Sequence, residues 1–238
     1  MYVQKRKKNF FFCFIFITFV AVKQTEMKKN PLLQLGNVPV QAGTLMSCFH
    51  NLAAPEKKIL ALEKDGQLIR LKRGLYVVSH EVSGKFVNPA LCANHIYGPS
   101  YISEHWALRW YGLIPERVYT LTSVTTKQTR TFENSLGRFT YDQVRPGYFS
   151  IGIRSIEEGG VTFLMASREK ALCDFILWDR YVPSQSVKTL WQYLEEDIRF
   201  DVDELPSFDV SIIEACAKMG RKEAILNNLI KIIKTLKQ

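Results

Sequence analysis

The chain has 238 residues, of which 47% are hydrophobic, and its 32 basic and 23 acidic side chains give a formal net charge of +9. Its five cysteines are scattered without a CxxC pair, which argues against a zinc site and against a disulfide framework. Neither an internal repeat nor a low-complexity tract occurs, and the length suits two domains.

The first 26 residues form a cationic and apolar extension. Lys5–Lys8 precede an apolar stretch from Phe10 to Val22, as in a secretory signal, but small residues suited to cleavage do not follow. As a helix the stretch would span about 20 Å, less than the ~30 Å hydrocarbon core of a bilayer. We therefore expect residues 1–26 to lie outside the fold as translated upstream sequence, with Met27 starting a cytoplasmic protein. A membrane anchor and an export signal are the alternatives.

Three short helices are predicted before residue 66. Leu32–Leu35 suits the end of a first helix, and Gln41–Asn51 suits a second with one apolar face. The third helix begins at Pro55, because proline is favoured at a first helical position. It ends at about Asp65, because Gly66 suits a left-handed cap.

A tight two-stranded hairpin is predicted after the third helix, because the apolar period drops to two. The candidate inward positions of its strands are Leu68, Leu71, Tyr76 and Val78. Lys72, Arg73 and Gly74 form the turn, and its adjacent cations are costly to bury, so we expect the turn to face water or an anion. Helices followed by such a hairpin over residues 27–80 predict a winged helix-turn-helix, which is a DNA-binding module.

The charge distribution favours the same function. Residues 27–87 hold nine basic and four acidic side chains, whereas residues 88–238 hold eighteen of each. Phosphate contacts favour such local positive charge, although lysines on a solvated helix face are the plain alternative. We expect the second helix to touch phosphate and the third to enter the major groove. The predicted DNA-binding residues are Gln41, Thr44, Lys57, Lys58, Lys64, Arg70, Lys72 and Arg73.

Residues 88–238 are predicted to form a larger α/β body domain after a polar linker at 79–88. Helices are expected over 89–98 and over 100–110, the latter with Ile102, Trp106 and Trp110 on one face. Short strand-like stretches between 118 and 166 predict a mainly antiparallel sheet.

The C-terminal part of the body domain is predicted to be helical. Ser167 caps a helix predicted over residues 168–181. The inward residues of that helix are predicted to be Ala171, Leu172, Phe175 and Ile176. The last 70 residues read as helices. The expected class is therefore α+β, with an N-terminal winged helix-turn-helix joined to this body domain.

Three sequence blocks point to a family: IRLKRGLYVV at 69–78, YISEHWALRWYGLIPE at 101–116 and, after a β-rich stretch, SREKALCDFIL at 167–177. In this pattern the chain resembles the AbiEi-type antitoxins of bacterial type IV toxin–antitoxin systems. The resemblance implies a cytoplasmic repressor that binds inverted repeats in its own promoter and opposes a nucleotidyltransferase toxin without a stable complex. It places the DNA-binding role on five of the predicted residues: Lys57, Lys58, Arg70, Lys72 and Arg73. Gly43 and the Ala53–Pro55 stretch depart from a regular helix pair, which weakens the base contacts more than the phosphate contacts.

We do not expect an enzyme, a metal or a cofactor. The histidines lack metal-ligand spacing, and His105 is predicted to be a packed or capping residue rather than a general base. Asp201 and Asp203 could hold Mg²⁺ if they lay on a strand, but no Gly-Ser phosphate turn precedes them, so a solvated acidic loop is favoured. The alternative function is a nucleic-acid-acting enzyme or adaptor delivered by the winged helix. As a regulator, the protein would bind as a homodimer or as paired monomers on a repeat.

Overall fold

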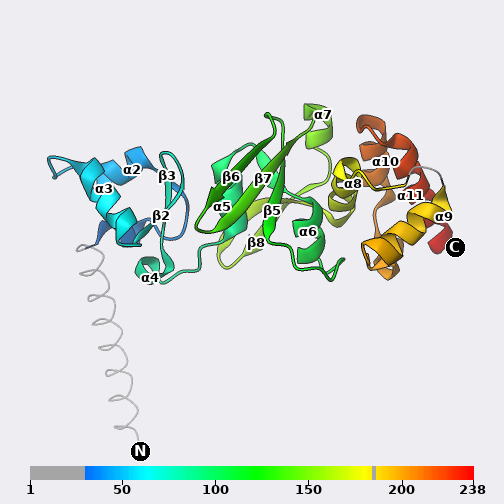
Figure 1. The fold of residues 1–238 in the computed structure, drawn as a ribbon, viewed down its shortest axis with the longest axis horizontal. Coiled ribbons are helices and arrows are strands. Elements are labelled where there is room, and N and C mark those ends of the chain that lie inside the picture. Colours follow the sequence, from blue (N-terminus) through cyan, green and yellow to red (C-terminus); the bar gives the residue numbers. More distant parts are fainter. Residues whose placement is uncertain (1–29, 184–185) are drawn as a thin grey trace, which may run out of the picture. The chain divides into compact units, whose positions relative to one another are not determined.

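Residues 30–183 and 186–238 are described by a computed structural model (Figure 1). The extension predicted for residues 1–26 lies outside these described residues. The fold combines helices with two separate sheets, which agrees with the expected α+β class. None of the helices in the two described ranges is long and apolar enough to span a bilayer.

Two compact units make up the described chain. One comprises the residues up to Arg70 together with Gly74–Val87, and the other comprises Leu71–Arg73 together with Asn88–Gln238. Lys72 and Arg73 therefore belong to the second unit, although the strand that leads to them begins in the first.

The first unit and its hairpin contain short helices and a three-stranded sheet with the strand order β1-β3-β2. The elements in chain order are the 3-10 helix η1 (Pro31–Gln34), β1 (Val40–Gln41), α2 (Ala42–Cys48), α3 (Pro55–Lys64), β2 (Leu68–Lys72), β3 (Leu75–Val78) and α4 (His80–Ser83). Strand β1 pairs antiparallel with β3, and Val40 lies opposite Tyr76. The hairpin predicted after Gly66 is present.

Local signals at both ends account for helix α3. Pro55 occupies its first turn, where no intrahelical N–H is needed. At the other end Gly66 adopts a φ of +72°, and the next amide, that of Gln67, donates to the carbonyl of Leu62 at 2.9 Å. Glycine takes this left-handed conformation without a steric penalty, so the chain can leave the helix and enter β2.

The core of the first unit is a cluster of buried side chains from η1, α2, α3 and the hairpin: Leu32, Leu45, Ile59, Leu62, Leu68, Tyr76 and Val78. Leu71 was also predicted to face inward, and it is buried, but it belongs to the second unit. The reason is parity: residues three apart on a strand face opposite sides, so Leu71 points away from Leu68.

The second unit contains a six-stranded sheet and most of the helices of the described chain. Its elements are α5 (Pro89–Ile96), β4 (Ser100–Ile102), α6 (Glu104–Trp110), β5 (Thr120–Thr125), β6 (Arg130–Asn134), β7 (Gly137–Gln143), α7 (Pro146–Phe149), β8 (Ile153–Glu158), β9 (Val161–Ala166), α8 (Arg168–Trp178), α9 (Val187–Gln192), the π-helical turn η2 (Tyr193–Asp197), the 3-10 helix η3 (Val202–Ser207), α10 (Val210–Met219) and α11 (Glu223–Leu236).

The large sheet has the strand order β6-β7-β5-β4-β9-β8. The pairs β6/β7, β4/β5 and β8/β9 are antiparallel, whereas β5/β7 and β4/β9 are parallel. The prediction of a mainly antiparallel sheet is therefore incomplete, because the sheet is mixed. Its hairpins are local and follow from turn signals, whereas the parallel pairs join strands that are not consecutive in sequence.

The helix predicted over residues 100–110 is wrong in its first third. Ser100–Ile102 forms strand β4 inside the sheet, with Ile102 opposite Ser123 on one side and Met165 on the other. Helix α6 starts only at Glu104. A strand of three buried residues is too short to show a period of two, and the supposed apolar stripe ends at Trp110, which is 39% exposed. Similarly, within the region 118–166 that was predicted to form strands, Pro146–Phe149 form the short helix α7, and the next strand begins only at Ile153.

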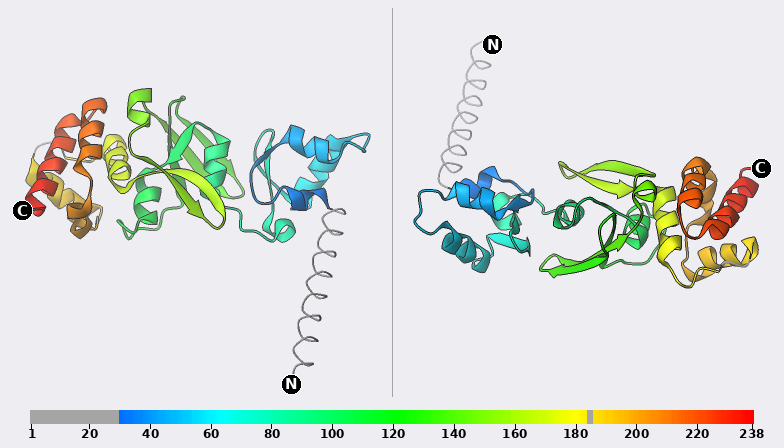
Figure 2. Two further views of the ribbon diagram at one scale, coloured as in Figure 1. Left: turned by 180° about the vertical axis from the view of Figure 1, so that it is seen from behind. Right: turned by 90° about the horizontal axis from the view of Figure 1, so that it is seen from above.

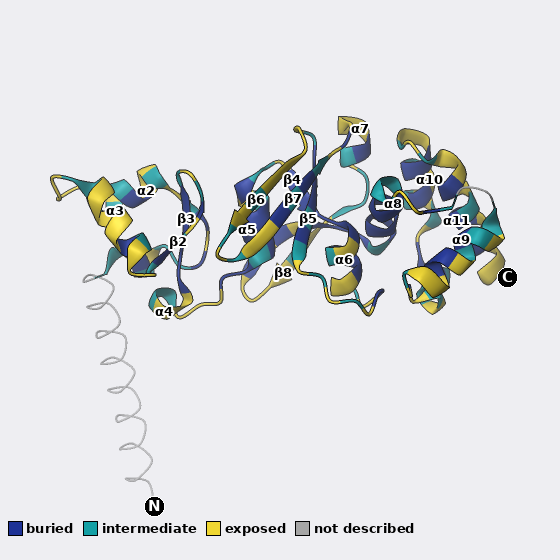
Figure 3. Ribbon diagram, viewed as in Figure 1, coloured by how far each residue is buried: buried dark blue, intermediate teal, exposed yellow. Residues whose placement is uncertain are grey.

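Helix α8 is surrounded by the other elements of the second unit. It contacts α6, β9, α10 and α11, and it is dark blue along most of its length in Figure 3. The orange and red helices α10 and α11 lie side by side in both views of Figure 2. As predicted, Ser167 caps α8 by accepting a hydrogen bond from the amide of Lys170.

Candidate functional site

Helix α3 presents cations on the side opposite the core. Ile59 and Leu62 are buried, whereas Lys57, Lys58 and Lys64 are exposed. The arrangement follows from the helical period, because residues three apart share one face and the intervening positions face outward. The exposed side of α3 is yellow in Figure 3.

The two predicted phosphate contacts of α2 are both exposed. Gln41 is the last residue of β1 and the extended residue that precedes α2, and Thr44 lies in the first turn of that helix. Leu45, which follows Thr44, is fully buried and fixes the helix against the core.

The hairpin residues differ in their surroundings. Arg70 is exposed, with Nη1 3.9 Å from the Glu63 carboxylate at the end of α3, and Arg73 is exposed at the turn. Lys72 is half-buried, and its Nζ donates a 2.6 Å hydrogen bond to the carbonyl of Ile96 within the second unit. The expectation that the whole turn faces solvent therefore fails for Lys72.

The surroundings of Lys72 also make its charged form less favourable than that of a free lysine. Burial, followed by the charges of Lys127 and Arg130, lowers the pKa of the Lys72 ammonium. Among the predicted hairpin cations, Lys72 is thus the one least suited to a phosphate contact.

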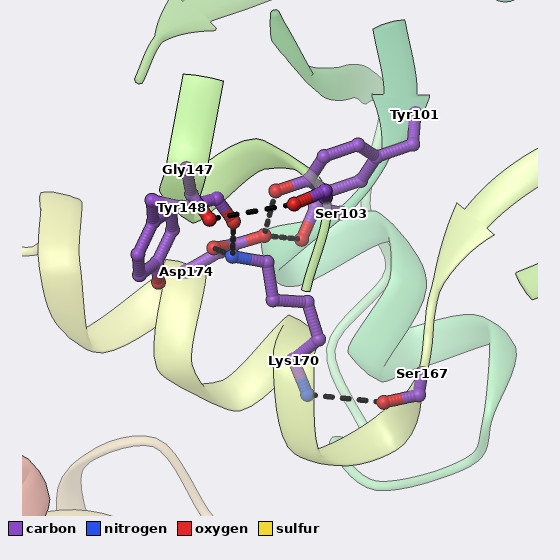
Figure 4. A network of polar contacts seen from close by, with 8 residues as sticks. Tyr101, Ser103, Gly147, Tyr148, Ser167, Lys170 and Asp174 are labelled. Carbon is purple, nitrogen blue, oxygen red and sulfur yellow. Dashed lines mark hydrogen bonds and ion pairs between the residues drawn. The ribbon is translucent and has the colours of Figure 1, made fainter. Parts of the chain in front are cut away.

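A second candidate site is a buried polar cluster on α8 that the sequence analysis did not identify (Figure 4). Lys170 and Asp174 are both fully buried, and Lys170 Nζ lies 3.1 Å from Asp174 Oδ1. The other Asp174 oxygen accepts hydrogen bonds from Ser103 Oγ at 2.6 Å and from Tyr101 OH at 3.0 Å. The available signal was an i, i+4 pair of opposite charges on a helix whose other residues after Glu169 are all apolar.

The ammonium of Lys170 has further partners. Its Nζ donates a 3.1 Å hydrogen bond to the carbonyl of Tyr148 and lies 3.1 Å from the centroid of the Tyr148 ring. The cluster thus joins β4, α7 and α8 through a compensated pair of charges. Side chains with no exposed surface hold elements together, and this is the role that the geometry of Lys170 and Asp174 supports.

Glu104 lies at the edge of the cluster in an unusual backbone conformation. Its φ is +54°, and only 7% of it is exposed. Oε1 has no hydrogen-bond partner among the described residues. Burial, together with the charges of Asp142 and Asp174, raises the pKa of the Glu104 carboxyl well above its ordinary value.

The residues considered in the sequence for catalysis or metal binding do not form a common site. The His105 ring packs edge-on against Phe175 with 4.8 Å between centroids, and burial lowers its pKa. Asp201 is exposed, and Asp203 lies in the 3-10 helix η3 rather than on a strand. Among the described residues, His, Cys, Asp and Glu side chains form no group of three or more that is arranged to hold a metal ion.

Comparison with known proteins gives no assignment. No protein-family model matches the chain, and no curated protein matches it either.

Proposed function

We propose that the protein is a DNA-binding autorepressor and antitoxin of a type IV toxin–antitoxin operon. The observation that carries the proposal is the set of exposed cations on α3 and on the hairpin directly after it: Lys57, Lys58, Lys64, Arg70 and Arg73. Residues 30–80 would act as a winged helix-turn-helix, with α3 as the recognition helix and the β2–β3 hairpin as the wing. Gln41 and Thr44 at the start of α2 would touch the backbone.

Electrostatics would supply most of the affinity in this proposal. Exposed lysines and arginines release counterions when they neutralise phosphates, and this contribution is independent of sequence. Arg73 and Arg70 would bind the phosphate backbone beside the groove, because an arginine presents several hydrogen-bond donors in a fixed plane. Lys72 is assigned a minor part, since its side chain is half-buried and its ammonium is held against the Ile96 carbonyl.

The second unit would carry out the antitoxin role without catalysing a reaction. Its charged cluster around Lys170 is fully buried, which favours a structural role for those residues. In the proposed operon, the protein acts in the cytoplasm, binds inverted repeats upstream of its own gene and opposes a nucleotidyltransferase toxin without a lasting complex. Neither a metal nor a cofactor is needed for this function.

A mobility-shift titration of the protein on its own upstream DNA tests the DNA-binding part. We expect Lys57→Ala/Lys58→Ala to lower the slope of log affinity against log salt by about two, because each lost phosphate contact contributes about 0.9. The matched control is Lys218→Ala/Lys231→Ala, which removes two exposed lysines of the second unit. An equal effect of the two double variants would contradict a specific role for α3.

Co-expression with the nucleotidyltransferase encoded beside the gene tests the antitoxin part. We expect the protein to restore growth, and the Lys57→Ala/Lys58→Ala variant to lose repression of the promoter while it still restores growth. Failure to restore growth, combined with cleavage or modification of nucleic acid by the purified protein, would favour the enzyme alternative instead.

A further inference from the structure

Two cations of the second unit lie against a pair of aromatic rings beside the C-terminal end of α5. Lys127 Nζ is 5.3 Å from the centroid of the Tyr97 ring. Arg130 Cζ is 6.0 Å from that centroid and 5.1 Å from the centroid of the Phe132 ring. We call Tyr97, Lys127, Arg130 and Phe132 the Tyr97 cluster. Lys127 and Arg130 are exposed, whereas the two rings are half-buried.

The aromatic rings are fixed from behind. Tyr97 and Phe132 both pack against Tyr141, at 5.3 Å and 5.7 Å between centroids. Tyr141 is fully buried, and its hydroxyl donates a 2.7 Å hydrogen bond to the carbonyl of Ala93 in α5. A guanidinium or ammonium over such a supported ring is held in place while its N–H groups stay available to a ligand.

The loop that carries Lys127 is held as well. Thr125 Oγ1 accepts a 3.2 Å hydrogen bond from the amide of Lys127 and donates one of 2.7 Å to the carbonyl of Pro99. The Lys127 ammonium donates to the carbonyl of Gly98 at 2.5 Å. These partners position the side chain, but a carbonyl is neutral and does not cancel the charge.

Nearby carboxylates point elsewhere. Neither Lys127 nor Arg130 takes part in an ion pair within the described ranges. Glu133 follows Phe132 and therefore faces the other side of β6, where its carboxylate lies 3.6 Å from Arg138. In a unit that contains eighteen acidic and eighteen basic residues over 88–238, two adjacent cations without a carboxylate form a local anion-binding surface.

Lys72 connects this surface to the hairpin. Its ammonium donates to the carbonyl of Ile96, next to Tyr97, and Lys127 and Arg130 are close enough to lower its pKa. Arg73, which follows Lys72 in the chain, is one of the residues that the proposed function assigns to the DNA backbone. The Tyr97 cluster thus lies close to Lys72, whose neighbour in the chain has a proposed phosphate ligand.

We propose that Lys127 and Arg130, supported by Tyr97 and Phe132, form a second phosphodiester-binding site that contacts the same DNA as α3. The inference rests on the proposed function, because that function supplies the DNA. The ligand is a backbone phosphate rather than a base, since the outer faces of both rings are already occupied by the two cations. The site therefore adds affinity and footprint but no sequence preference.

The test compares full-length variants on the upstream DNA. We expect Lys127→Ala/Arg130→Ala to lower the salt slope by about two, so that the loss of affinity between 50 and 200 mM salt becomes about tenfold smaller than for the wild type. Lys127→Gln/Arg130→Gln keeps much of the side-chain bulk but removes both charges, so it should lower the salt slope as much as the alanine variant does. Lys218→Ala/Lys231→Ala is the matched control and should keep the wild-type slope. Unchanged thermal unfolding of each variant establishes that the fold is intact.

The outcomes separate this inference from the proposed function. A wild-type slope in both Lys127/Arg130 variants, with a reduced slope in Lys57→Ala/Lys58→Ala, would overturn the second site and leave α3 as the interface. A wild-type protein that does not bind its upstream DNA would overturn both. Titration with inorganic phosphate alone at constant ionic strength distinguishes a DNA phosphate from a free phosphate anion as the ligand. Saturable phosphate binding that the variants lose, without a change in DNA binding, would assign the site to a free anion and overturn the DNA contact.

Discussion

The fully buried pair Lys170 and Asp174 is the residue-scale feature that most constrains the second unit. Two charges can be taken out of water together only if their remaining hydrogen-bonding groups are satisfied. Ser103 and Tyr101 do this for the carboxylate, and the carbonyl and ring of Tyr148 do it for the ammonium. Removal of one partner leaves the other charged and unpaired in the core.

We therefore expect Lys170→Met to destabilise the protein by about 3–5 kcal/mol. Lys170→Met/Asp174→Leu should recover most of that loss, because it leaves no isolated charge. Urea unfolding followed by tryptophan fluorescence measures both. Lys234→Met is the control, since its ion pair with Glu214 is largely exposed and should contribute less than about 1 kcal/mol. A cost for Lys170→Met as small as that of the control would contradict the role assigned to the pair.

Glu104 should make stability depend on pH. Because burial raises its pKa in the folded protein, the native state binds the proton more tightly than the unfolded state does. Its contribution is therefore most favourable below the ordinary value of 4.5 and is lost as the pH rises toward the raised pKa.

Glu104→Gln keeps the shape of the side chain and removes its titration. We expect the variant to gain stability relative to the wild type as the pH rises from 4 to 8, measured as the shift in urea midpoint. All other groups titrate in both proteins, so their effects cancel in the difference. Parallel curves for the two proteins over this range would show that Glu104 is not held protonated.

At the scale of elements, two glycines of the first unit have opposite roles. Gly66 ends α3 with a φ of +72°, whereas Gly43 lies inside α2, and a methyl group at either position would meet nothing within 4 Å. The two positions therefore differ in backbone conformation rather than in available space.

We expect Gly66→Ala to destabilise the protein by about 1–2 kcal/mol, because an L-residue resists the left-handed conformation. Gly43→Ala should stabilise it by roughly 0.5–1 kcal/mol, because glycine is a poor helix former. Each variant is the control for the other, and thermal unfolding measures both. The same sign of effect at both positions would refute the assignment of the helix end to Gly66.

Element prediction succeeded where the signal is local. The helix 55–65 follows from Pro55 and Gly66, and the structure departs from it by one residue at its end. The start of the helix after Ser167 follows from its cap, but that helix ends at Trp178, three residues earlier than predicted. Strand β4 could not be predicted, because its partners Ser123 and Met165 are distant in the sequence and its three residues show no period of their own.

The whole molecule combines a basic N-terminal part with a neutral larger one. If the five exposed cations of α3 and the hairpin and the two of the Tyr97 cluster each neutralise one phosphate, log affinity for DNA should fall against log salt with a slope of about −6. Affinity should then fall several thousandfold between 50 and 200 mM salt. Titrations on the upstream DNA and on a scrambled duplex of equal length measure this dependence, and a slope near zero would show that the cations do not meet the backbone.

The features that depend on neighbouring residues follow from the sequence alone: the bounds of α3, the start of α8, the hairpin after Gly66, and the outward direction of Lys57, Lys58 and Lys64. Dihedral preferences, caps and periodicity act over a few residues, so they can be recognised along the chain. The features that depend on distant contacts become visible only in the folded protein. These are the parallel strand pairs, the burial of Lys170 with Asp174, and the hydrogen bond that withdraws Lys72 from the solvent. Their energies arise between segments 18 or more residues apart, up to 73 for Tyr101 and Asp174, and no local pattern encodes which segments meet.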